Sequence, residues 1–273
     1  MSLPVALQLY SVRDQLAKDY AATLREVKRM GYDYVELAGL GGNTPDKVKK
    51  MVDDAGLTIV SSHVPLDDLL KDTDKTLTDY ASLGCKYVAV PWLEEQRRPG
   101  HPGFESTIND IFYVGKAAKD LGLVLLYHNH DFEFVKIDER YALDVLYDTI
   151  PSDILQTQID TCWVHFAGVE PAGYLKKYID RAPLVHLKDF TADPASNESP
   201  YELIGKDTPK LSREERSFEF QPLGYGKQNI PSLLEASLYV GAKYVIVEQD
   251  QSIRRPSLED AKLSRETLKK YGW

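Results

Sequence analysis

One phrase recurs along the chain: a stripe of apolar residues at helical spacing, then a glycine, then a run of β-branched and aromatic residues. Clear copies lie at residues 30–35, 83–88 and 240–245, and weaker copies lie at residues 55–60 and 121–125. Glycine readily takes the left-handed conformation that ends a helix, and the apolar run after it is typical of a buried strand. The stripe before the first of these glycines, Leu24, Val27 and Met30, has the spacing of one helix face. The sequence therefore predicts helices and strands that alternate.

The pattern predicts eight strands, at residues 4–10, 33–38, 58–63, 86–91, 123–130, 155–160, 184–189 and 243–249. It predicts eight helices, at residues 20–30, 45–55, 67–83, 106–121, 141–149, 171–181, 230–240 and 257–270. Strict alternation makes a parallel sheet, and eight rounds favour closure into a (β/α)₈ TIM barrel of the α/β class. A doubly wound open sheet is the alternative, but no G-x-G-x-x-G motif follows the first strand. Because no linker or composition shift interrupts the pattern, we expect a single domain over residues 1–273.

One connection is much longer than the others. Residues 190–228, between the seventh strand and its helix, are rich in proline, glycine and charged residues. Connections of this length usually form a lid or a subunit contact, and an ordinary solvated loop is the alternative. We expect three aromatic residues of this connection to be exposed, which favours a homo-oligomer contact. They are Tyr201, Phe218 and Phe220.

Composition narrows the function classes. The formal net charge of −9 disfavours a nucleic-acid partner, because such a surface repels phosphate backbones. Cys85 and Cys162 are too few for a disulfide framework and lack the spacing of a zinc finger, which fits a reducing compartment. No apolar run reaches the roughly 20 residues of a membrane span, and the first residues do not resemble a signal peptide. We therefore expect a cytoplasmic protein without a membrane partner.

Polar side chains gather at the predicted strand ends, where the active sites of such barrels lie. They include four of the six histidines, and the set is Glu36, His63, His128, His130, Glu133, Asp160, His186, Lys188 and Glu248. Several carboxylates packed together need a cation to neutralise them. Three carboxylates and one imidazole suit Mn²⁺, Co²⁺, Mg²⁺ or Zn²⁺. Each residue alone has a structural alternative, an ion pair or a core histidine, so the argument depends on the whole set.

Six short segments of the sequence, taken together, carry a resemblance to a known family. They are QLYSVRD, YHNHDFEF, IDTCW, VHLKD, PLGYG and VEQD, at residues 8–14, 127–134, 159–163, 185–189, 222–226 and 247–250. With them the chain resembles the xylose-isomerase-like TIM-barrel superfamily, especially its sugar phosphate isomerase/epimerase branch. The phrases follow in order over nearly the whole chain and are specific to the branch, but not to one substrate.

The resemblance implies a single divalent metal ion (Mn, Co, Mg or Zn) held by residues from strands five to eight. Asp160, His186 and Glu248 match the last three ligands directly. Many relatives carry a glutamate inside strand five, where this chain has Leu126, Tyr127 and His128. Glu133 is the nearest carboxylate and is the expected fourth ligand, with His130 as the alternative.

The resemblance also implies the chemistry. A substrate hydroxyl and carbonyl chelate the metal, and a carboxylate then removes the acidified C–H proton to give an enediolate. Glu133 and Glu248 are the expected acid/base pair, and Lys188 is expected to stabilise a substrate oxygen or to bind a phosphate. The residues expected to line the pocket are Gln8, Tyr10, Glu36, His63, His128, His130 and Trp163. Trp163 and Trp92 would stack on a sugar ring or only fill core volume, and the turn at 224–226 would bind phosphate or be a turn alone.

Several functions remain open at this point. Isomerisation or epimerisation of a keto-sugar, sugar phosphate or polyol is the expected activity. Dehydration of an inosose or a 3-keto-sugar would begin with the same proton abstraction. The superfamily's DNA-repair endonucleases are disfavoured by the small number of histidines and the negative charge. A non-catalytic barrel that only binds a small molecule is the last alternative.

Overall fold

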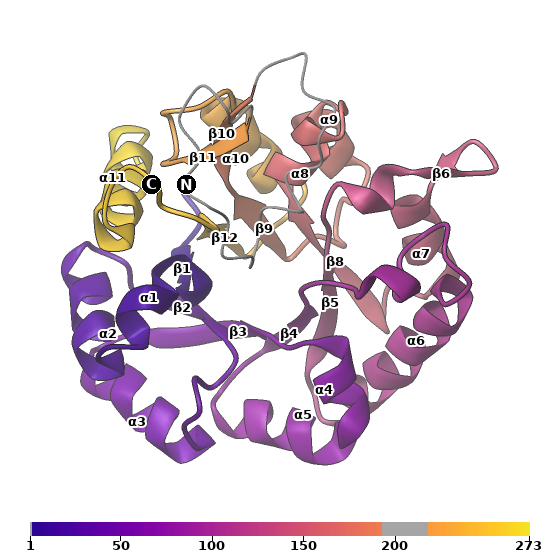
Figure 1. Ribbon diagram of the computed structural model, residues 1–273, viewed down its shortest axis with the longest axis horizontal. Coiled ribbons are helices and arrows are strands. Elements are labelled where there is room, and N and C mark those ends of the chain that lie inside the picture. The colour runs from indigo at the N-terminus through magenta and orange to yellow at the C-terminus, as the bar shows by residue number, and fades with distance from the viewer. Residues whose placement is uncertain (1, 193–217) are drawn as a thin grey trace.

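The computed structural model describes residues 2–192 and 218–273. Eight parallel strands close into a barrel in the order β1-β2-β3-β4-β5-β8-β9-β12, and β12 returns to β1 (Figure 1). The strands are β1 Val5–Gln8, β2 Tyr34–Ala38, β3 Thr58–His63, β4 Tyr87–Val90, β5 Val124–His128, β8 Leu155–Asp160, β9 Leu184–Leu187 and β12 Tyr244–Val247. All eight predicted strands are present, and the predicted (β/α)₈ barrel is confirmed.

Helices surround the barrel (Figure 1). They are α1 Arg13–Leu16, α2 Tyr20–Arg29, α3 Pro45–Asp54, α4 Leu66–Lys71, α5 Thr73–Ser82, α6 Phe104–Asp120, α7 Ala142–Thr149, α8 Thr161–Phe166, α9 Pro171–Lys176, α10 Ile230–Tyr239 and α11 Ser257–Lys270. Short 3₁₀ turns lie at η1 Leu9–Val12, η2 Glu95–Arg97 and η3 Phe132–Phe134. None of the described helices is both long and apolar enough to cross a membrane.

Two helical predictions need correction. The single helix expected over 67–83 is broken at Asp72, whose backbone is extended (φ −156°, ψ 83°) and whose side chain accepts a hydrogen bond from Lys75 N. An aspartate in this role starts a new helix, so α5 begins there. The sequence pattern also missed α8, which Asp160 caps by accepting hydrogen bonds from the backbone N–H groups of Cys162 and Trp163.

The inside of the barrel is apolar at one end and polar at the other. Side chains two residues apart share a face of a strand, so each inward apolar residue is followed by an inward polar one. These pairs are Ala6 and Gln8, Tyr34 and Glu36, Leu126 and His128, Leu184 and His186, and Ile246 and Glu248. The apolar members form a floor with Val60, Tyr87 and Ala89, and the polar members lie above it at the carboxyl ends of the strands. The register places them level, with Gln8 opposite Glu36 and Asp160 opposite His186.

The described ends of the long connection form a small antiparallel sheet of β10 (Asp189–Ala192) and β11 (Phe218–Gln221). Phe218 and Phe220 are buried there against Trp163 and Phe190, so their predicted exposure is wrong. The β10–β11 sheet packs against α8, and the ring of Phe218 stacks on the ring of Trp163. Tyr201 and residues 193–217 of the lid predicted over 190–228 lie outside the described residues. The homo-oligomer stays a prediction, without Phe218 and Phe220 as support. A second hairpin, β6 (Lys136–Ile137) with β7 (Arg140–Tyr141), projects from the barrel in Figure 1.

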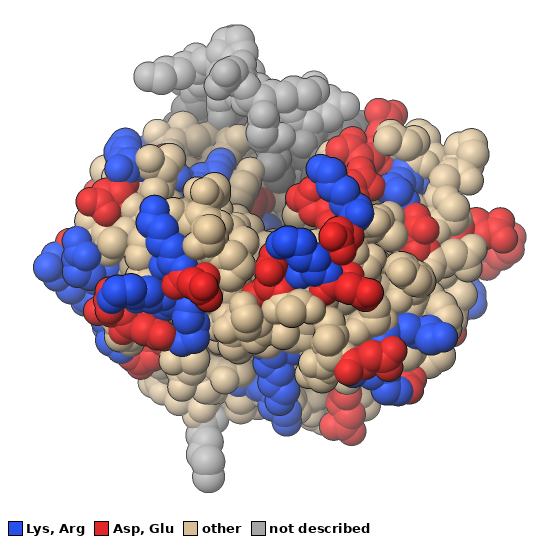
Figure 2. All heavy atoms as spheres, turned by 90° about the horizontal axis from the view of Figure 1, so that it is seen from below, with Lys and Arg blue, Asp and Glu red and all other residues tan. Residues whose placement is uncertain are grey.

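The surface carries mixed charge. On the face in Figure 2, Lys and Arg side chains lie among Asp and Glu side chains and do not gather into one basic area. Among the charged side chains of the described residues, several are paired along helices, including Lys49 with Asp53 and Lys75 with Asp79. Exposed pairs of this kind contribute little stability, because water and salt screen the attraction between the two charges.

The turn at 222–228 is built around the carboxylate of Asp189. Asp189 Oδ2 accepts hydrogen bonds from Gly224 N and Gly226 N at 2.9 and 3.0 Å, and Oδ1 accepts them from Phe190 N and Gln228 N at 2.9 and 3.0 Å. The N–H groups that would bind a phosphate here are thus already bonded to a side chain. The structure supports the turn alone and not the phosphate site.

This packing makes Gly226 sensitive to substitution. A methyl group at Gly226 would overlap the Asp189 carboxylate and the Phe190 carbonyl oxygen. Gly226→Ala is therefore expected to lower the free energy of unfolding by about 1–3 kcal/mol in denaturant titrations. Tyr225→Ala in the same turn, at a half-exposed side chain, is the control and is expected to change it by about 0.5 kcal/mol or less. Equal effects of the two substitutions would contradict the tight packing of the turn on Asp189.

Candidate metal centre

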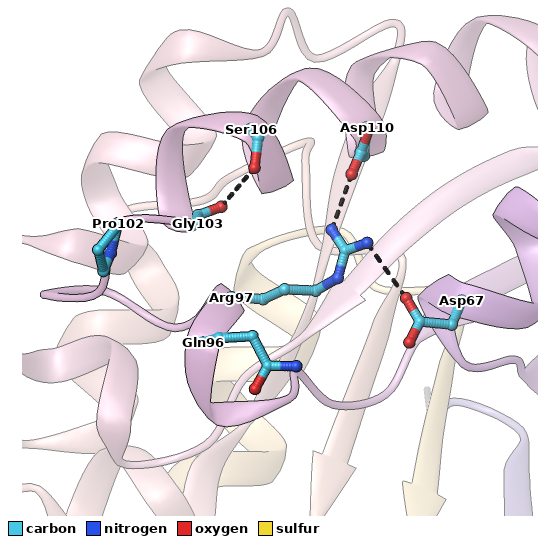
Figure 3. A pocket seen from close by; sticks show the side chains of 7 residues that line it. All are labelled: Asp67, Gln96, Arg97, Pro102, Gly103, Ser106 and Asp110. Carbon is cyan, nitrogen blue, oxygen red and sulfur yellow. Dashed lines mark hydrogen bonds and ion pairs between the residues drawn. The ribbon is translucent and has the colours of Figure 1, made fainter.

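A hollow on the outside of the barrel, beside α4 and α6, holds an arginine whose charge is already balanced. Its volume is about 450 Å³, and its lining is Asp67, Gln96, Arg97, Pro102, Gly103, Ser106 and Asp110 (Figure 3). Arg97 lies 2.7 Å from Asp110 and 3.2 Å from Asp67. Two carboxylates around one guanidinium leave no positive charge to attract an anionic substrate.

A different group of polar side chains lies inside the barrel, at the carboxyl ends of the strands. All of its members are buried, and they are Glu36, His63, His128, Gln158, Asp160, His186, Lys188, Glu248 and Asp250. They come from five barrel strands (β2, β3, β5, β8 and β9) and from the segments that follow β9 and β12. Burial of so many charged groups is costly unless each is paired.

Glu36 lies at the centre of this group. Its carboxylate accepts hydrogen bonds from Gln8 Nε2 at 2.7 Å, Gln158 Nε2 at 2.6 Å and the hydroxyl of Ser61. It also contacts His186 Nε2 at 2.7 Å. Burial acts to raise the pKa of Glu36, but the neighbouring His63 and His186 outweigh it and hold that pKa well below its usual range. Glu36 is therefore a buried carboxylate that stays ionised.

His186 bridges two carboxylates. Its Nε2 faces Glu36, and its Nδ1 lies 2.9 Å from Glu248 Oε2. Burial acts to lower the pKa of His186, but Glu36 and Glu248 outweigh it and raise the pKa to about 10. An imidazole that binds a metal through Nδ1 must give up the proton there, so a metal ion would replace that proton between His186 and Glu248.

Lys188 places its ammonium group among three carboxylates. Its Nζ lies 3.2 Å from Asp160 Oδ2, 3.0 Å from Glu248 Oε2 and 3.1 Å from Asp250 Oδ1. Burial acts to lower the pKa of Lys188, but these carboxylates raise it well above its usual range. Burial also raises the pKa of Asp250, to about 6, with Lys188 opposing the shift. Lys188 thus remains charged inside the barrel.

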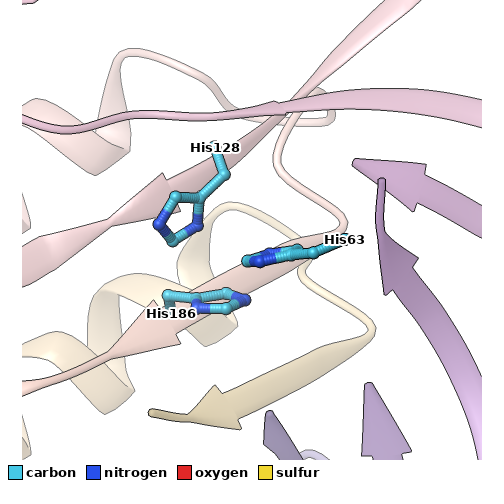
Figure 4. A group of neighbouring side chains, drawn as sticks. All are labelled: His63, His128 and His186. Carbon is cyan, nitrogen blue, oxygen red and sulfur yellow. The ribbon is translucent and has the colours of Figure 1, made fainter. Parts of the chain in front are cut away.

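Two overlapping groups of the described residues have the spacing to hold a metal ion. One is His63, His128 and His186, shown in Figure 4. The other is His128, Asp160, His186 and Glu248, whose ligand atoms lie within 4.8 Å of one another.

The four-residue group fits an ion better. In the three-histidine group the rings of His63 and His186 stack, with centroids 5.2 Å apart and planes 13° apart. A ring nitrogen binds a metal in the plane of its ring, so stacked rings do not converge on one ion. The nitrogen His63 Nε2 is also 2.8 Å from Gln158 Oε1.

The donor atoms of the four-residue group suit a divalent cation. Asp160 Oδ2 is buried and has no hydrogen-bond partner among the described residues, although Lys188 lies nearby. Four buried carboxyl groups (Glu36, Asp160, Glu248 and Asp250) outnumber the cationic side chains Lys188 and His186. A divalent ion with nitrogen and carboxylate ligands, of the Zn²⁺, Mn²⁺ or Co²⁺ type, would balance this charge.

The structure brings Asp160, His186 and Glu248 together as the sequence predicted, but it places Glu133 elsewhere. Glu133 is buried, and its carboxylate accepts hydrogen bonds from Tyr127 Oη at 2.5 Å and from His130 N at 2.8 Å. Tyr127 points to the outer face of β5 and His128 to the inner face, because neighbouring side chains in a strand alternate. His128 therefore stands in the ligand group where Glu133 was expected. His130, the alternative ligand, also lies outside both metal groups.

The other predicted pocket residues surround the group. Gln8 donates a hydrogen bond to Glu36, and His63 stacks on His186. The His130 ring stacks on Phe132 and lies 5.5 Å from Trp163.

The predicted aromatic platforms are only partly open. Trp163 is fully buried in the aromatic cluster with Lys188 Nζ 5.4 Å from its ring, so it fills core volume. Tyr10 is half-buried under the Arg13 guanidinium, and Trp92 is half-buried under Arg98.

Four residues of the site were missed from the sequence. Asp250 and Gln158 lie two residues from Glu248 and Asp160, which is the spacing that keeps side chains on one strand face. Ser61 is two residues before His63 in the same way. Asn129 accepts a hydrogen bond from Asp160 N at 2.9 Å and donates one to Asp160 O at 3.3 Å, so it holds the backbone of a ligand. The spacing of two was available in the sequence for the first three.

The burial of Glu133 predicts a pH dependence. Burial raises the pKa of Glu133 to about 8 in the folded protein from a usual value near 4.5. Between these values the folded protein holds a proton that the unfolded chain releases, so stability falls as pH rises from 5 to 8, with a slope up to about 1.4 kcal/mol per pH unit. Glu133→Gln removes this contribution. The difference in unfolding free energy between the parent and Glu133→Gln should therefore change with pH in favour of the variant, and parallel curves in denaturant titrations would contradict it.

Comparisons with known proteins identify the family of the fold. The family model for the xylose isomerase-like TIM barrel matches residues 24–271. An inosose dehydratase of Geobacillus kaustophilus (strain HTA426) is 24% identical over 192 residues, which are 62% of this chain and 62% of that relative. This chain thus spans less than two thirds of the length of that relative.

Solved structures show the same fold. A sugar phosphate isomerase/epimerase from Parabacteroides distasonis ATCC 8503 has a TM-score of 0.77 at 24% identity, over 98% of both chains. A structure of the IOLI protein with a binding zinc atom has a TM-score of 0.71 at 16% identity, over 98% of this chain and 96% of that one. Since the family model covers nearly the whole chain, the protein belongs to the xylose isomerase-like TIM barrel family.

Proposed function

We propose that the protein is a divalent-metal-dependent enzyme that removes a proton next to the carbonyl of a keto-sugar or a cyclic polyol ketone. The observation that carries the proposal is the buried group of His128, Asp160, His186 and Glu248 at the carboxyl ends of the strands. A divalent ion bound there supplies a Lewis acid that polarises a carbonyl and stabilises negative charge on its oxygen. His128 takes the strand-five position that we expected Glu133 to occupy.

Dehydration is the outcome that the acid and base groups favour. Glu133, the expected second carboxylate, is bonded to Tyr127 away from the ligand group. The groups beside the ligands are Asp250 and Lys188, which contact each other at 3.1 Å. Burial raises the pKa of Asp250, which makes its carboxylate a stronger base than an exposed one. Its carboxylate takes the C–H proton, a C=C bond forms, and the β-hydroxyl leaves as water with a proton from the Lys188 ammonium.

The relatives support this reading. The Geobacillus kaustophilus relative is named an inosose dehydratase, and the zinc in the IOLI structure accords with a metal site in this fold. We therefore propose an inosose or a related 3-keto-sugar as the substrate. We propose that it is unphosphorylated, because the N–H groups of the 222–228 turn are bonded to Asp189.

Isomerisation or epimerisation is the second candidate. It shares the proton abstraction, and the Parabacteroides distasonis structure is named a sugar phosphate isomerase/epimerase. In that reaction the proton returns to carbon and no water is lost. The mass of the product separates the two candidates.

Metal analysis tests the site directly. The purified protein is expected to bind one divalent ion per chain after incubation with Zn²⁺, Mn²⁺ or Co²⁺. His186→Ala and Glu248→Ala should weaken binding by more than the roughly 10–100-fold typical of removing an outer partner. Glu133→Gln is the matched control, a buried carboxylate outside the group, and should keep the metal. Loss of metal in Glu133→Gln would return Glu133 to the ligand set, and no binding by the parent would exclude the metal mechanism.

Solvent exchange tests the reaction. With inososes and 3-keto-sugars in D₂O, the metal-loaded protein is expected to release a product that has lost one water, detected by mass spectrometry. Lys188→Gln should slow this by about 10²–10⁴-fold, because it removes the proton donor, while the metal stays bound to its four ligands. Lys227→Gln, at an exposed position on the 222–228 turn, is the control. A product of unchanged mass that carries deuterium would instead identify an isomerase or epimerase.

A further inference from the structure

Glu36 is fully buried, ionised and bonded on every side, yet it is outside the four-residue ligand group. It lies on β2, and its donors come from four other strands of the barrel: Gln8 on β1, Ser61 on β3, Gln158 on β8 and His186 on β9. These strands are distributed around the barrel, so Glu36 ties its opposite walls together. The proton-transfer chemistry proposed above does not use it.

We propose that Glu36 is a positioning residue that fixes the ring orientation and the tautomer of His186, so that His186 Nδ1 faces the metal position. This assignment rests on the proposed metal site. It gives a role to a buried carboxylate on β2, a strand that contributes no ligand to the four-residue group.

The hydrogen bonds of Glu36 leave it no capacity to bind a metal itself. A carboxylate has about four lone-pair positions. Oε1 accepts from Gln8 Nε2 and His186 Nε2, both at 2.7 Å, and Oε2 accepts from Gln158 Nε2 at 2.6 Å and from the Ser61 hydroxyl. His63 Nε2 also lies 3.1 Å from Oε1. These contacts occupy the lone-pair positions, so the carboxylate cannot rotate without breaking bonds. Glu36 is therefore a fixed acceptor and not a ligand.

A fixed acceptor dictates the state of the ring beside it. Gln8 Nε2, Gln158 Nε2 and the Ser61 hydroxyl all donate to the Glu36 carboxylate, which therefore acts as an acceptor. His186 Nε2 then carries the hydrogen that it donates to Glu36. In the neutral ring Nδ1 is then the bare nitrogen, and it points to Glu248 at 2.9 Å, within the ligand group. The stacked ring of His63 limits rotation of His186 on one face. Carboxylates that orient metal-binding histidines in this way raise metal affinity.

Gln158 extends the same control to His63. Its Nε2 donates to Glu36, so its amide is oriented with Oε1 toward His63 Nε2, which lies 2.8 Å away. His63 Nε2 also lies 3.1 Å from Glu36 Oε1, so the ring that stacks on His186 contacts the same carboxylate both directly and through Gln158. Loss of the Glu36 charge would release both rings.

Metal affinity in Glu36→Gln tests the assignment. The Gln amide has one acceptor oxygen and one donor nitrogen, so it cannot satisfy all four donors at once. Zn²⁺ affinity, measured by competition with a chelator, is expected to fall about 10–100-fold. Glu133→Gln replaces another fully buried carboxylate outside the ligand group and should bind Zn²⁺ like the parent. Ser61→Ala removes one donor to Glu36 with little change in volume, and a smaller fall is expected if Glu36→Gln does not fold.

Two spectroscopic readouts distinguish positioning from other roles. Ring ¹⁵N shifts of His186 in the Zn²⁺-loaded parent should show a protonated Nε2 and a metal-bound Nδ1, and this pattern should be lost or mixed in Glu36→Gln. The visible absorption of bound Co²⁺ depends on how many ligands the ion has. The Co²⁺-loaded Glu36→Gln variant should therefore show the same coordination number as the Co²⁺-loaded parent. A reduced ligand number would make Glu36 a ligand and overturn the assignment.

The outcomes also separate this inference from the proposed function. Zn²⁺ binding by the parent with unchanged affinity and an unchanged His186 pattern in Glu36→Gln would overturn the role of Glu36 alone. Failure of the parent itself to bind Zn²⁺, Mn²⁺ or Co²⁺ would overturn the proposed function, and this assignment with it.

Discussion

Negative charge held away from water is the constraint on which the upper half of the barrel depends. The carboxyl groups of Glu36, Asp160, Glu248 and Asp250 are all buried there. Moving one such ion out of water costs several kcal/mol even after a protein relaxes around it. Two cationic side chains balance part of the charge of these carboxylates. His186 lies between Glu36 and Glu248, and Lys188 lies between Asp160, Glu248 and Asp250.

The apolar floor below makes this arrangement possible. Leu126, Leu184 and Ile246 fill the barrel beneath His128, His186 and Glu248. These apolar side chains exclude water from the lower part of the barrel. Each of them also packs two residues before a polar side chain on the same strand, which fixes the position of that side chain along the barrel axis. Polar groups on rigid strands hold their positions better than groups on loops, which suits a site that must bind an ion at defined distances. Asp160 adds to this rigidity, because one of its carboxylate oxygens caps α8 while the other faces Lys188.

Most of the fold was predictable from the sequence, because the recurring glycine and apolar run mark each return to the barrel. The local exceptions have local causes. Asp72 both ends α4 and starts α5, which a helical stripe of apolar residues does not reveal. Phe218 and Phe220 were predicted to be exposed because they lie in a long connection. The sequence does not reveal that the end of this connection pairs with β10 and packs on α8.

The site was predictable in part. Asp160, His186 and Glu248 follow from strand ends and resemblance together. The fourth ligand was assigned to Glu133 because a carboxylate was expected, whereas the alternation of β5 turns His128 inward and leaves Glu133 with Tyr127. Glu36 was placed in the pocket, but its saturation by donors from four strands depends on barrel closure, which brings together residues from 8 to 186 in the chain.

The turn at 222–228, which is bonded to Asp189, suggests how such a barrel could change its substrate class. Its carboxylate sits in a cradle of main-chain N–H groups, the kind of concave site that receives phosphate groups in other proteins. The protein thus carries an internal substitute for an anionic ligand, covalently attached and always present. A descendant of this chain that acts on phosphorylated sugars would not need a new loop. It would need only a shorter side chain at Asp189, the first residue of β10, to free the N–H groups of the existing loop.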